Sequence, residues 1–405
     1  MRRIIKYTIG IFGLLINCWI VFVNAKQYYK PEIITENEIT YNNDVYKQLQ
    51  FLKKALRNGA GKDMQAVFPE GFIFINALYG LSWSEFIDSM SKQSKIYKEG
   101  IEELTFAIQQ TQTDEAKYIF DETLPLKYGA FYMGWSTYLI GAKLKVQRPE
   151  ERLPKDVELF SKNCRMIQNA IDQQELPYLE SYLNNTWPAD GIIAVSSLHL
   201  YNTYLNGNMQ KSVTSWMDKV KQNLDTKHGL IPHKVSAVTG ESLQGVRGCS
   251  QSLILNFIKN IDLEFAKDQF AKYKSLFVDT RVGLSGIREY PKGVFGLGDV
   301  DSGPVIWDIG ASASVVGQRT MGLYGEYDLY NELRNNIEGF GFGRSTSSGK
   351  QYLFGQMPMM DAFFAWSNAL ETNEYKSNYS NRIPWKFHIV SLVILLIYLL
   401  IFIKI

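Results

Sequence analysis

The stretch Gly71-Phe-Ile-Phe-Ile-Asn-Ala-Leu-Tyr-Gly-Leu81 decides the fold, together with the similar stretch Asp190-Gly-Ile-Ile-Ala-Val-Ser-Ser-Leu-His-Leu200. Both are apolar around most of the helical circumference, so each predicts a helix that other elements must cover on every side. Met209 to Leu224 has the same period but carries charged residues on one side, which predicts a helix at the surface. Wholly apolar and amphipathic helices therefore alternate along the chain.

Helical apolar spacing recurs over most of the chain and predicts about a dozen helices. An open bundle would leave the wholly apolar helices in water, so we predict a closed all-α domain, an (α/α)6 toroid with six inner and six outer helices. In that fold, loops at one end of the inner helices surround a central cavity. An α-solenoid remains the alternative, although the chain has no strict repeat. The predicted helices are Val45 to Leu56, Gly71 to Met90, Ile101 to Thr111, Leu126 to Leu144, Val157 to Glu175, Asp190 to Leu205, Met209 to Leu224, Ser250 to Ile261, Leu263 to Phe277, Val305 to Leu323, Glu326 to Gly339 and Met359 to Leu370.

The N-terminal segment, residues 1–25, predicts a membrane or export signal. A basic start, Met1-Arg-Arg-Ile-Ile-Lys6, precedes an apolar run, and Val23-Asn-Ala25 has the small-residue pattern of a signal-peptidase site. The segment is either a cleaved signal peptide or a retained anchor, and both alternatives predict export.

Residues 386–405 predict a C-terminal transmembrane helix, because Trp385 and Lys386 precede an almost wholly apolar run. The lysine and arginine residues at both extreme ends place those ends in the cytoplasm. We therefore expect residues 26–385 to form one extracytoplasmic domain attached to the plasma membrane, with the lipid bilayer as its first partner.

The charge of the chain argues against nucleic acid as a partner. The 405 residues include 43 Lys and Arg and 41 Asp and Glu. Setting aside the five basic residues of the two end segments leaves 38 basic and 41 acidic residues, a net charge of −3 for the rest. A slightly acidic domain has no electrostatic footprint for nucleic acid. Three cysteines in a chain of this size do not form a disulfide framework, and whether Cys164 and Cys249 pair stays open.

A long loop from Gly283 to Trp307 is the strongest indication of a functional site. It contains six glycines before Pro304 and three carboxylates, Glu289, Asp299 and Asp301. Loops of this length in a compact domain are usually functional. Asp301 is also placed to cap a helix that begins near Val305.

Acidic residues also stand at the starts of several predicted inner helices. Glu70 precedes the first apolar helix, Asp190 opens another, and Asp361 lies in the first turn of a later one. A carboxylate at a helix start can simply cap free N–H groups, so capping is the alternative for each. Their repetition beside Pro, Gly or Trp suggests instead that some of them line one pocket. We take Glu70, Asp190, Glu289, Asp299 and Asp301 as catalytic candidates and Asp361 as a substrate-binding candidate.

Paired carboxylates suit general acid–base catalysis. One must stay protonated while the other is ionised, and burial among aromatic side chains supplies that difference. Such a pair could cleave a glycosidic bond, add or remove water, or abstract a proton beside a carbonyl. The sequence does not choose among these reactions.

Further binding candidates are polar or aromatic residues in glycine-flanked loops or at helix starts. His233 is a hydrogen-bonded structural residue or a site residue. The two arginines could form salt bridges or bind an anion, and the two aromatic residues could stack on a sugar ring or pack in the core. Cys249, at a helix start, could act as an acid or nucleophile. These candidates are Tyr132, Trp187, His233, Arg247, Cys249 and Arg288.

No motif predicts a cofactor or a metal. The sequence has no phosphate-cradling glycine loop, HExxH motif or GxSxG elbow. Asp299-Val-Asp-Ser-Gly303 resembles part of a calcium loop but lacks the later ligands. We expect a site that works without a cofactor.

Several motifs resemble those of bacterial membrane proteins grouped with linalool dehydratase/isomerase. They are Pro69-Glu-Gly-Phe72, Ala77-Leu-Tyr-Gly-Leu-Ser-Trp83, Trp187-Pro-Ala-Asp190, Arg288-Glu-Tyr-Pro291 and Asp299-Val-Asp-Ser-Gly-Pro304. The resemblance covers most of residues 45–370 and implies an (α/α)6 barrel related to the six-hairpin glycosidases, with a cofactor-independent acid–base site. That enzyme relies on Asp, His, Tyr and a pair of Cys. Here Asp190 is the nearest match, and Cys249 has no evident partner.

Three functions follow as hypotheses. The first is a membrane-anchored acid–base enzyme that acts on a glycan or related polyol. The second is a lyase or isomerase of the dehydratase type that acts on a small hydroxylated substrate. The third is an envelope protein that binds a polysaccharide or protein partner without catalysis.

Overall fold

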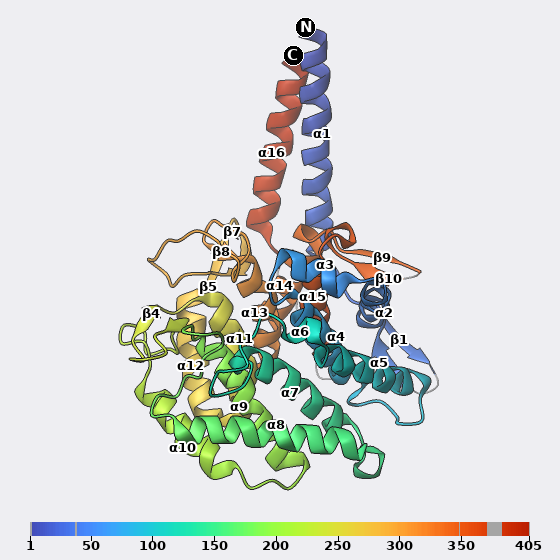
Figure 1. The fold of residues 1–405 in the computed structure, drawn as a ribbon. Coiled ribbons are helices and arrows are strands. Elements are labelled where there is room, and N and C mark those ends of the chain that lie inside the picture. The colour runs from blue at the N-terminus through green and yellow to red at the C-terminus, as the bar shows by residue number, and fades with distance from the viewer. Residues whose placement is uncertain (1, 37–38, 348, 371–382, 405) are drawn as a thin grey trace.

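The computed structural model describes residues 2–36, 39–347, 349–370 and 383–404 of the chain. These residues form a helical domain from which two long helices project side by side at one end, α1 (Arg2–Lys26) and α16 (Trp385–Lys404) (Figure 1). The predicted domain limits, at residues 25 and 386, fall close to the inner ends of these two helices. The domain assignment itself stays a prediction.

Six inner helices form a closed ring. Each contacts the next in chain order, and the last, α15, contacts the first, α4. This closure confirms the predicted (α/α)6 toroid and excludes the open solenoid. The inner helices are α4 (Gly71–Ile87), α7 (Gly129–Val146), α9 (Pro188–Tyr204), α11 (Gly248–Ile261), α13 (Ala311–Leu323) and α15 (Pro358–Ala369).

Six outer helices surround this ring, and each contacts at least one inner helix. They are α2 (Asn43–Arg57), α5 (Lys95–Thr111), α8 (Pro154–Gln173), α10 (Gln210–Gln222), α12 (Leu263–Phe277) and α14 (Tyr327–Phe340). Helix α5 begins at Lys95 rather than at Ile101 as predicted, because the Ser94 hydroxyl accepts a hydrogen bond from the Tyr97 amide and caps the helix there. Two short helices that we did not predict, α3 (Ala60–Val67) and α6 (Asp114–Lys117), lie in the connections.

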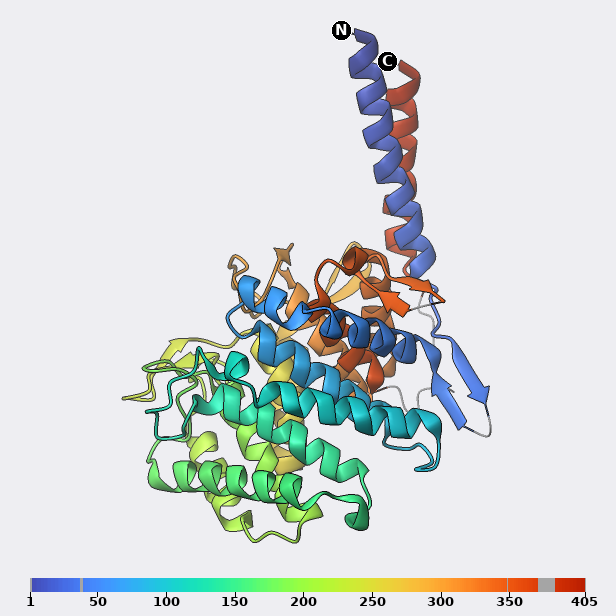
Figure 2. The same cartoon turned by 45° about the vertical axis from the view of Figure 1, so that its right-hand side comes forward.

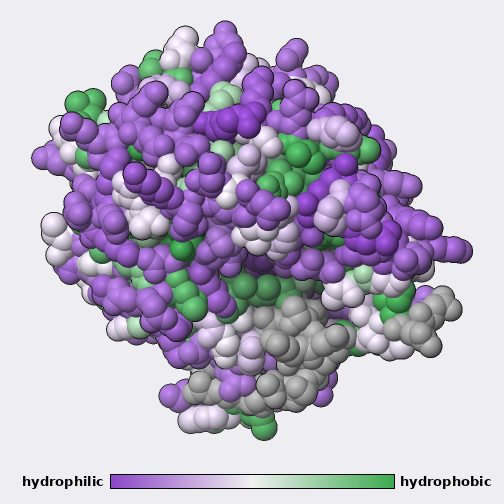
Figure 3. Space-filling view, turned by 90° about the horizontal axis from the view of Figure 1, so that it is seen from below, coloured by the Kyte–Doolittle hydropathy of each residue, from purple (hydrophilic) through white to green (hydrophobic). Residues whose placement is uncertain are grey.

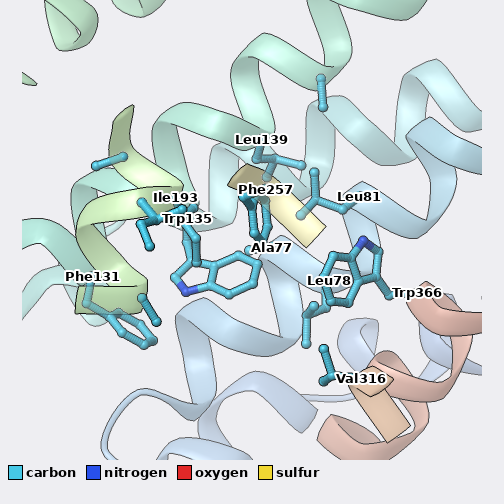
Figure 4. Packing of buried hydrophobic residues seen from close by; sticks show 14 of the residues in the cluster. Ala77, Leu78, Leu81, Phe131, Trp135, Leu139, Ile193, Phe257, Val316 and Trp366 are labelled. Carbon is cyan, nitrogen blue, oxygen red and sulfur yellow. The ribbon is translucent and has the colours of Figure 1, made fainter. Parts of the chain in front are cut away.

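Aromatic side chains fill the middle of the ring, where we had expected a central cavity (Figure 4). Trp135, Phe257 and Trp366 come from three different inner helices and are all buried. The ring centroids of Phe257 and Trp366 lie 6.0 Å apart in a stacked arrangement, and Trp135 meets both rings edge to face. Offset and edge-to-face aromatic pairs add to the stabilisation from burial. These aromatic side chains therefore occupy the middle of the ring, a pocket lined by Phe257, Trp366, Glu85 and Arg319 lies beside them, and the polar candidates lie around the ends of the helices.

The described residues also form five two-stranded hairpins: β1–β2 (Ile33–Glu36, Ile39–Asn42), β3–β4 (Lys234–Val235, Ser242–Gln244), β5–β6 (Val278–Arg281, Leu284–Ile287), β7–β8 (Val305–Ile306, Ile309–Gly310) and β9–β10 (Arg344–Thr346, Gly349–Gln351). The hairpin β7–β8 corrects one prediction. The helix expected from Val305 begins only at Ala311, because Trp307 and Asp308 adopt positive φ angles and turn the chain back on itself. Asp301 therefore does not cap a helix.

Helices α1 and α16 contact each other along their length. The Tyr398 hydroxyl donates to the Gly10 carbonyl at 2.8 Å, and the Asn24 amide donates to the Ser391 hydroxyl at 2.9 Å. Val23 of α1 is buried and packs against Gly339 of α14. Of the helices in the described residues, one, over Trp385–Phe402, is long and apolar enough to cross a membrane, and Gly10–Lys26 is a shorter apolar helix. Arg2, Arg3, Lys6 and Lys404, on which the predicted orientation depends, lie outside the described side chains.

A buried ionic network ties the end of α1 to the domain. The Lys350 ammonium contacts the Glu338 carboxylate, lies 3.2 Å from Asp44 and donates to the Tyr29 hydroxyl at 2.8 Å. Lys26 reaches the other oxygen of Glu338 at 3.1 Å. Two cations balance two buried carboxylates, so none of these charges is left without compensation.

Candidate active site

Asp190 is a buried carboxyl group at the start of an inner helix. The segment Thr186-Trp-Pro-Ala-Asp190 places it in the first turn of α9, where Pro188 starts the helix. The side chain is buried and accepts a hydrogen bond from the Ser181 hydroxyl at 2.6 Å. Burial, together with the negative charges of Asp301 and Glu70, raises the pKa of Asp190 to about 7, although the Ser181 hydrogen bond opposes the shift. Asp190 can therefore hold a proton near neutral pH.

Tyr182 bonds one of the predicted acids and interacts electrostatically with two others. Its hydroxyl donates to Glu70 Oε1 at 2.5 Å, and its pKa is raised by burial and by the charges of Glu70, Asp190 and Asp301. These three carboxyl groups come from residues far apart in the sequence, and the phenol lies among them. We did not predict Tyr182, and the one signal in the sequence is its place in the turn just before Trp187 and α9.

Arg247 holds two acids of the long loop. Its Nε donates to Glu289 Oε1 at 2.7 Å, and its two terminal nitrogens donate to the two oxygens of Asp299 at 2.7 and 2.8 Å. A planar guanidinium is suited to such a bidentate pair. Hydrogen bonding to Arg247 holds the pKa of Asp299 well below its usual range, so Asp299 is ionised and committed to this contact.

Cys249 and Glu289 form a buried pair. The thiol donates to Glu289 Oε1 at 3.0 Å, while Oε2 has no hydrogen-bond partner within the described part of the chain. Burial raises the pKa of Glu289 in spite of the opposing Arg247 charge, and burial with the nearby Glu289 raises the pKa of the Cys249 thiol. The backbone at residue 248 passes close to the backbone at Arg288. Only glycine fits at position 248, because a Cβ there would lie 1.9 Å from the Arg288 carbonyl oxygen.

His233 lies between Asp301 and Arg247. Its Nδ1 contacts the Ser250 hydroxyl, and its Nε2 lies 3.3 Å from both Asp301 Oδ2 and an Arg247 nitrogen. Nε2 can donate to Asp301 or accept from Arg247, but one tautomer cannot do both. Burial lowers the pKa of His233, so the ring is neutral at pH 7 and can exchange between these two partners.

Hydrogen bonds and ion pairs join Glu289, Asp299, Asp301, His233, Arg247 and Cys249, while Glu70, bonded to Tyr182, and Asp190 form a second group that interacts electrostatically with Asp301. We call these residues together the acidic cluster. The side chains of Asp299 and Asp301 are about half exposed, and Glu289 is fully buried. The cluster therefore runs from solvent at the loop into the protein, with Asp190 at its buried side.

Trp187 borders the acidic cluster and is partly exposed. Its ring meets that of Tyr182 edge to face at 5.8 Å, and the Lys234 ammonium lies 4.4 Å from its centroid. Its indole N–H has no hydrogen-bond partner among the described residues. This nitrogen is itself buried, so Trp187 offers a ligand the exposed part of its ring, of which Lys234 covers a portion.

Three other candidates lie apart from the acidic cluster. Tyr132 is buried behind Phe120, and its hydroxyl donates to the Thr111 carbonyl. Arg288 binds Asp279, Asp308 and the carbonyls of Tyr290 and Val294, so it shapes the long loop. Asp361 accepts from the Tyr352 amide at 2.7 Å in the first turn of α15, and burial raises its pKa to about 8.

The site offers no arrangement of metal ligands in the residues that the structure describes, where no group of three or more His, Cys, Asp or Glu side chains could hold a metal ion. The expectation of a site that works without a cofactor stays a prediction. Cys18, Cys164 and Cys249 are all free, and Cys164 is buried, so Cys164 and Cys249 do not pair.

Comparison with known proteins gives structural similarity without sequence similarity. No known protein family and no curated protein matches the chain. The resemblance to linalool dehydratase/isomerase-like proteins therefore stays a hypothesis. Among solved structures, the chain is similar to the GH76A alpha-1,6-mannanase from Salegentibacter sp. HEL1_6, with 11% identity and a TM-score of 0.45 over 74% of this chain and 90% of that chain. It is also similar to an inactive double Asp-to-Asn variant of that mannanase in complex with alpha-1,6-mannotriose, with 10% identity and a TM-score of 0.49 over 81% and 99%.

Proposed function

We propose that this protein is a membrane-anchored glycan hydrolase in which Asp190 is the general acid. The observation that carries the proposal is the contrast between carboxyl groups in the acidic cluster. Asp190 is buried with a pKa raised to about 7, while Asp301, about half exposed, faces the Nε2 atom of His233. A buried carboxyl group that holds its proton, together with a more exposed carboxyl group whose charge acts on it, supports acid–base hydrolysis of an acetal.

In the proposed reaction, Asp190 donates its proton to the oxygen that links two sugars, and the bond from the anomeric carbon to that oxygen breaks. A water molecule adds to the anomeric carbon and gives one proton to Asp301, so the products are two shorter glycans. Tyr182 holds Glu70 in place beside this pair, and the ionised Asp299 anchors the loop that carries Asp301. Trp187 supplies part of an aromatic face for the sugar.

The two projecting helices support attachment to a membrane. The apolar helix α16 and the pairing of α1 with α16 favour a retained N-terminal anchor over a cleaved signal peptide. We propose that both helices enter the bilayer and that the domain lies outside the cytoplasm, as the basic ends of the sequence predict.

The test is hydrolysis of glycans by the full-length protein in detergent, with release of reducing ends as the readout. We would begin with alpha-1,6-linked manno-oligosaccharides and extend the panel to other linkages. Asp190→Asn should abolish turnover, whereas Asp361→Asn, which is also in the first turn of an inner helix but outside the acidic cluster, should retain it. Equal activity of both variants would contradict the proposal.

A second candidate is a lyase or isomerase that acts on a small hydroxylated substrate. The contact of the Cys249 thiol with buried Glu289 favours it, because both groups have raised pKa values and can hold protons. In that reaction Cys249→Ser should abolish water loss from the substrate, while glycans remain uncleaved. If the wild type binds glycans and turns over neither class, the non-catalytic binding hypothesis is supported instead.

A further inference from the structure

Five large apolar side chains are exposed on the loop that carries Asp299 and Asp301. Their exposed fractions are 81% for Phe295, 88% for Leu297, 67% for Val300, 68% for Ile306 and 69% for Trp307. We call these residues the apolar rim. Soluble proteins rarely gather so many exposed large apolar side chains in one short segment without a binding partner.

The backbone of this segment is fixed, so the apolar side chains are held outward. The Tyr290 hydroxyl donates to the Leu297 carbonyl at 3.0 Å, and an Arg288 nitrogen donates to the Val294 carbonyl at 3.2 Å. The Gly303 amide donates to the Asp299 carbonyl at 2.9 Å, next to the bidentate contact of Asp299 with Arg247. Residues on both sides of the apolar rim are therefore anchored to the domain.

The apolar rim lies beside the base of the projecting helices. Arg281 of the hairpin β5–β6 donates to the Trp307 carbonyl at 2.9 Å, and this contact links β5–β6 to the hairpin β7–β8. At the tip of β5–β6, a Cβ on Gly283 would lie 2.8 Å from Lys386 Cβ and 3.1 Å from the Phe387 amide, at the start of α16. Figures 1 and 2 show these hairpins at the end of the domain from which α1 and α16 leave.

The opposite end of the domain has a different surface. In the view from below, the part that Figure 3 colours is mainly hydrophilic, with scattered apolar patches. The exposed apolar side chains of the loop are thus concentrated at the end of the domain where the proposed membrane helices begin.

We infer that the apolar rim inserts into the surface of the same bilayer that α1 and α16 enter, and that this contact places the acidic cluster at the membrane surface. The inference rests on the proposed membrane attachment. Aromatic and aliphatic side chains next to a membrane helix are typical of interfacial contacts, and Trp is favoured at that depth. Asp299 and Asp301 lie between Leu297 and Ile306, so a substrate that reaches them does so beside the lipid headgroups. A glycan carried by a membrane-embedded lipid fits this position.

The test uses the full-length protein in vesicles of phosphatidylcholine, with and without bromine atoms on the acyl chains. Bromine quenches tryptophan emission at short range. We would compare Leu297→Trp with Leu153→Trp, a matched control at an exposed position just before α8, at the end of the domain away from the helices. The added tryptophan at position 297 should lose emission in brominated vesicles, and the one at position 153 should not. Trp307→Phe, at an exposed position, should remove part of the quenching of the wild type.

Equal responses of the two added tryptophans would overturn the inference. Unchanged quenching in Trp307→Phe would also overturn it. A third contrary result is a dimer in detergent that Leu297→Ser converts to a monomer, because a second copy would then cover the apolar rim. The quenching does not depend on catalysis, so lack of glycan hydrolysis would contradict the proposed activity alone. Failure of the protein to enter vesicles would contradict both the membrane attachment and the apolar rim's role.

Discussion

Replacing Asp190 by asparagine removes a carboxyl group whose ionisation the folded protein disfavours. Asparagine has nearly the same shape, and its side-chain oxygen can still accept the Ser181 hydrogen bond. Burial and the two neighbouring acids raise the pKa of Asp190 from its ordinary 3.8 to about 7. A tenfold change in proton affinity corresponds to about 1.4 kcal/mol, so the contribution of Asp190 to the stability of the folded wild type falls by about 4 kcal/mol as the pH rises from about 4 to 8.

The direction in which stability changes with pH follows from proton binding. Between pH 3.8 and about 7 the folded state binds the Asp190 proton and the unfolded chain does not, so the contribution of Asp190 to the free energy of unfolding falls as the pH rises and is constant above about pH 7. The asparagine side chain of the variant does not titrate. The free energy of unfolding of the variant minus that of the wild type should therefore increase by about 4 kcal/mol over this range.

The assay is urea unfolding of the full-length protein in mild detergent, followed by tryptophan fluorescence at several pH values. Asp279→Asn is the control for which the pH dependence has the opposite sign, because hydrogen bonds from the Thr280 amide and from Arg288 and Arg281 hold the pKa of Asp279 below the usual range in spite of its partial burial. Its removal should cost stability at neutral pH and little at low pH. A difference between wild type and Asp190→Asn that does not change with pH would refute the buried, protonated Asp190.

Three further variants test the architecture. Lys350→Ala should destabilise the protein by about 3–5 kcal/mol, because it leaves two buried carboxylates with less compensation, and chemical unfolding measures the loss. Gly248→Ala should cost about 1–3 kcal/mol, since its Cβ would lie 1.9 Å from a backbone oxygen, whereas Gly191→Ala, with its nearest atom at 3.9 Å, should be close to neutral; thermal unfolding of both variants tests this contrast. Arg247→Lys keeps the charge but loses the bidentate contact with Asp299, so hydrogen exchange over residues 290–303 should become faster, and unchanged exchange would contradict the anchoring role.

The toroid was predictable because the inner and outer helices differ in composition. The stretch from Gly71 to Leu81 has no polar face, and it can be stable in water only inside a closed layer of other helices. The start of α13 was not predictable in the same way. Val305 and Ile306 fit helical spacing, but Trp307 and Asp308 take positive φ angles that a tryptophan rarely adopts and that no local signal indicates.

The acidic cluster was predictable only in part. Acids beside Gly, Pro or Trp could be selected from the sequence, because each stands where an apolar helix begins or in the long loop. Their partners could not be assigned, since Tyr182 reaches Glu70 across 112 positions and Arg247 reaches Asp299 across 52. Asp361 has the same local sequence features as Asp190, and only the packing of its helix separates it from the cluster.

The most direct test of the account is the pH dependence of glycan hydrolysis by the full-length protein. With Asp190 as the general acid, kcat/KM should fall above about pH 7, where Asp190 loses its proton, and Asp190→Asn should remove the activity while Asp361→Asn keeps both the rate and the profile. An Asp190→Asn variant that cleaves glycans at the wild-type rate, with the same pH profile, would contradict the account.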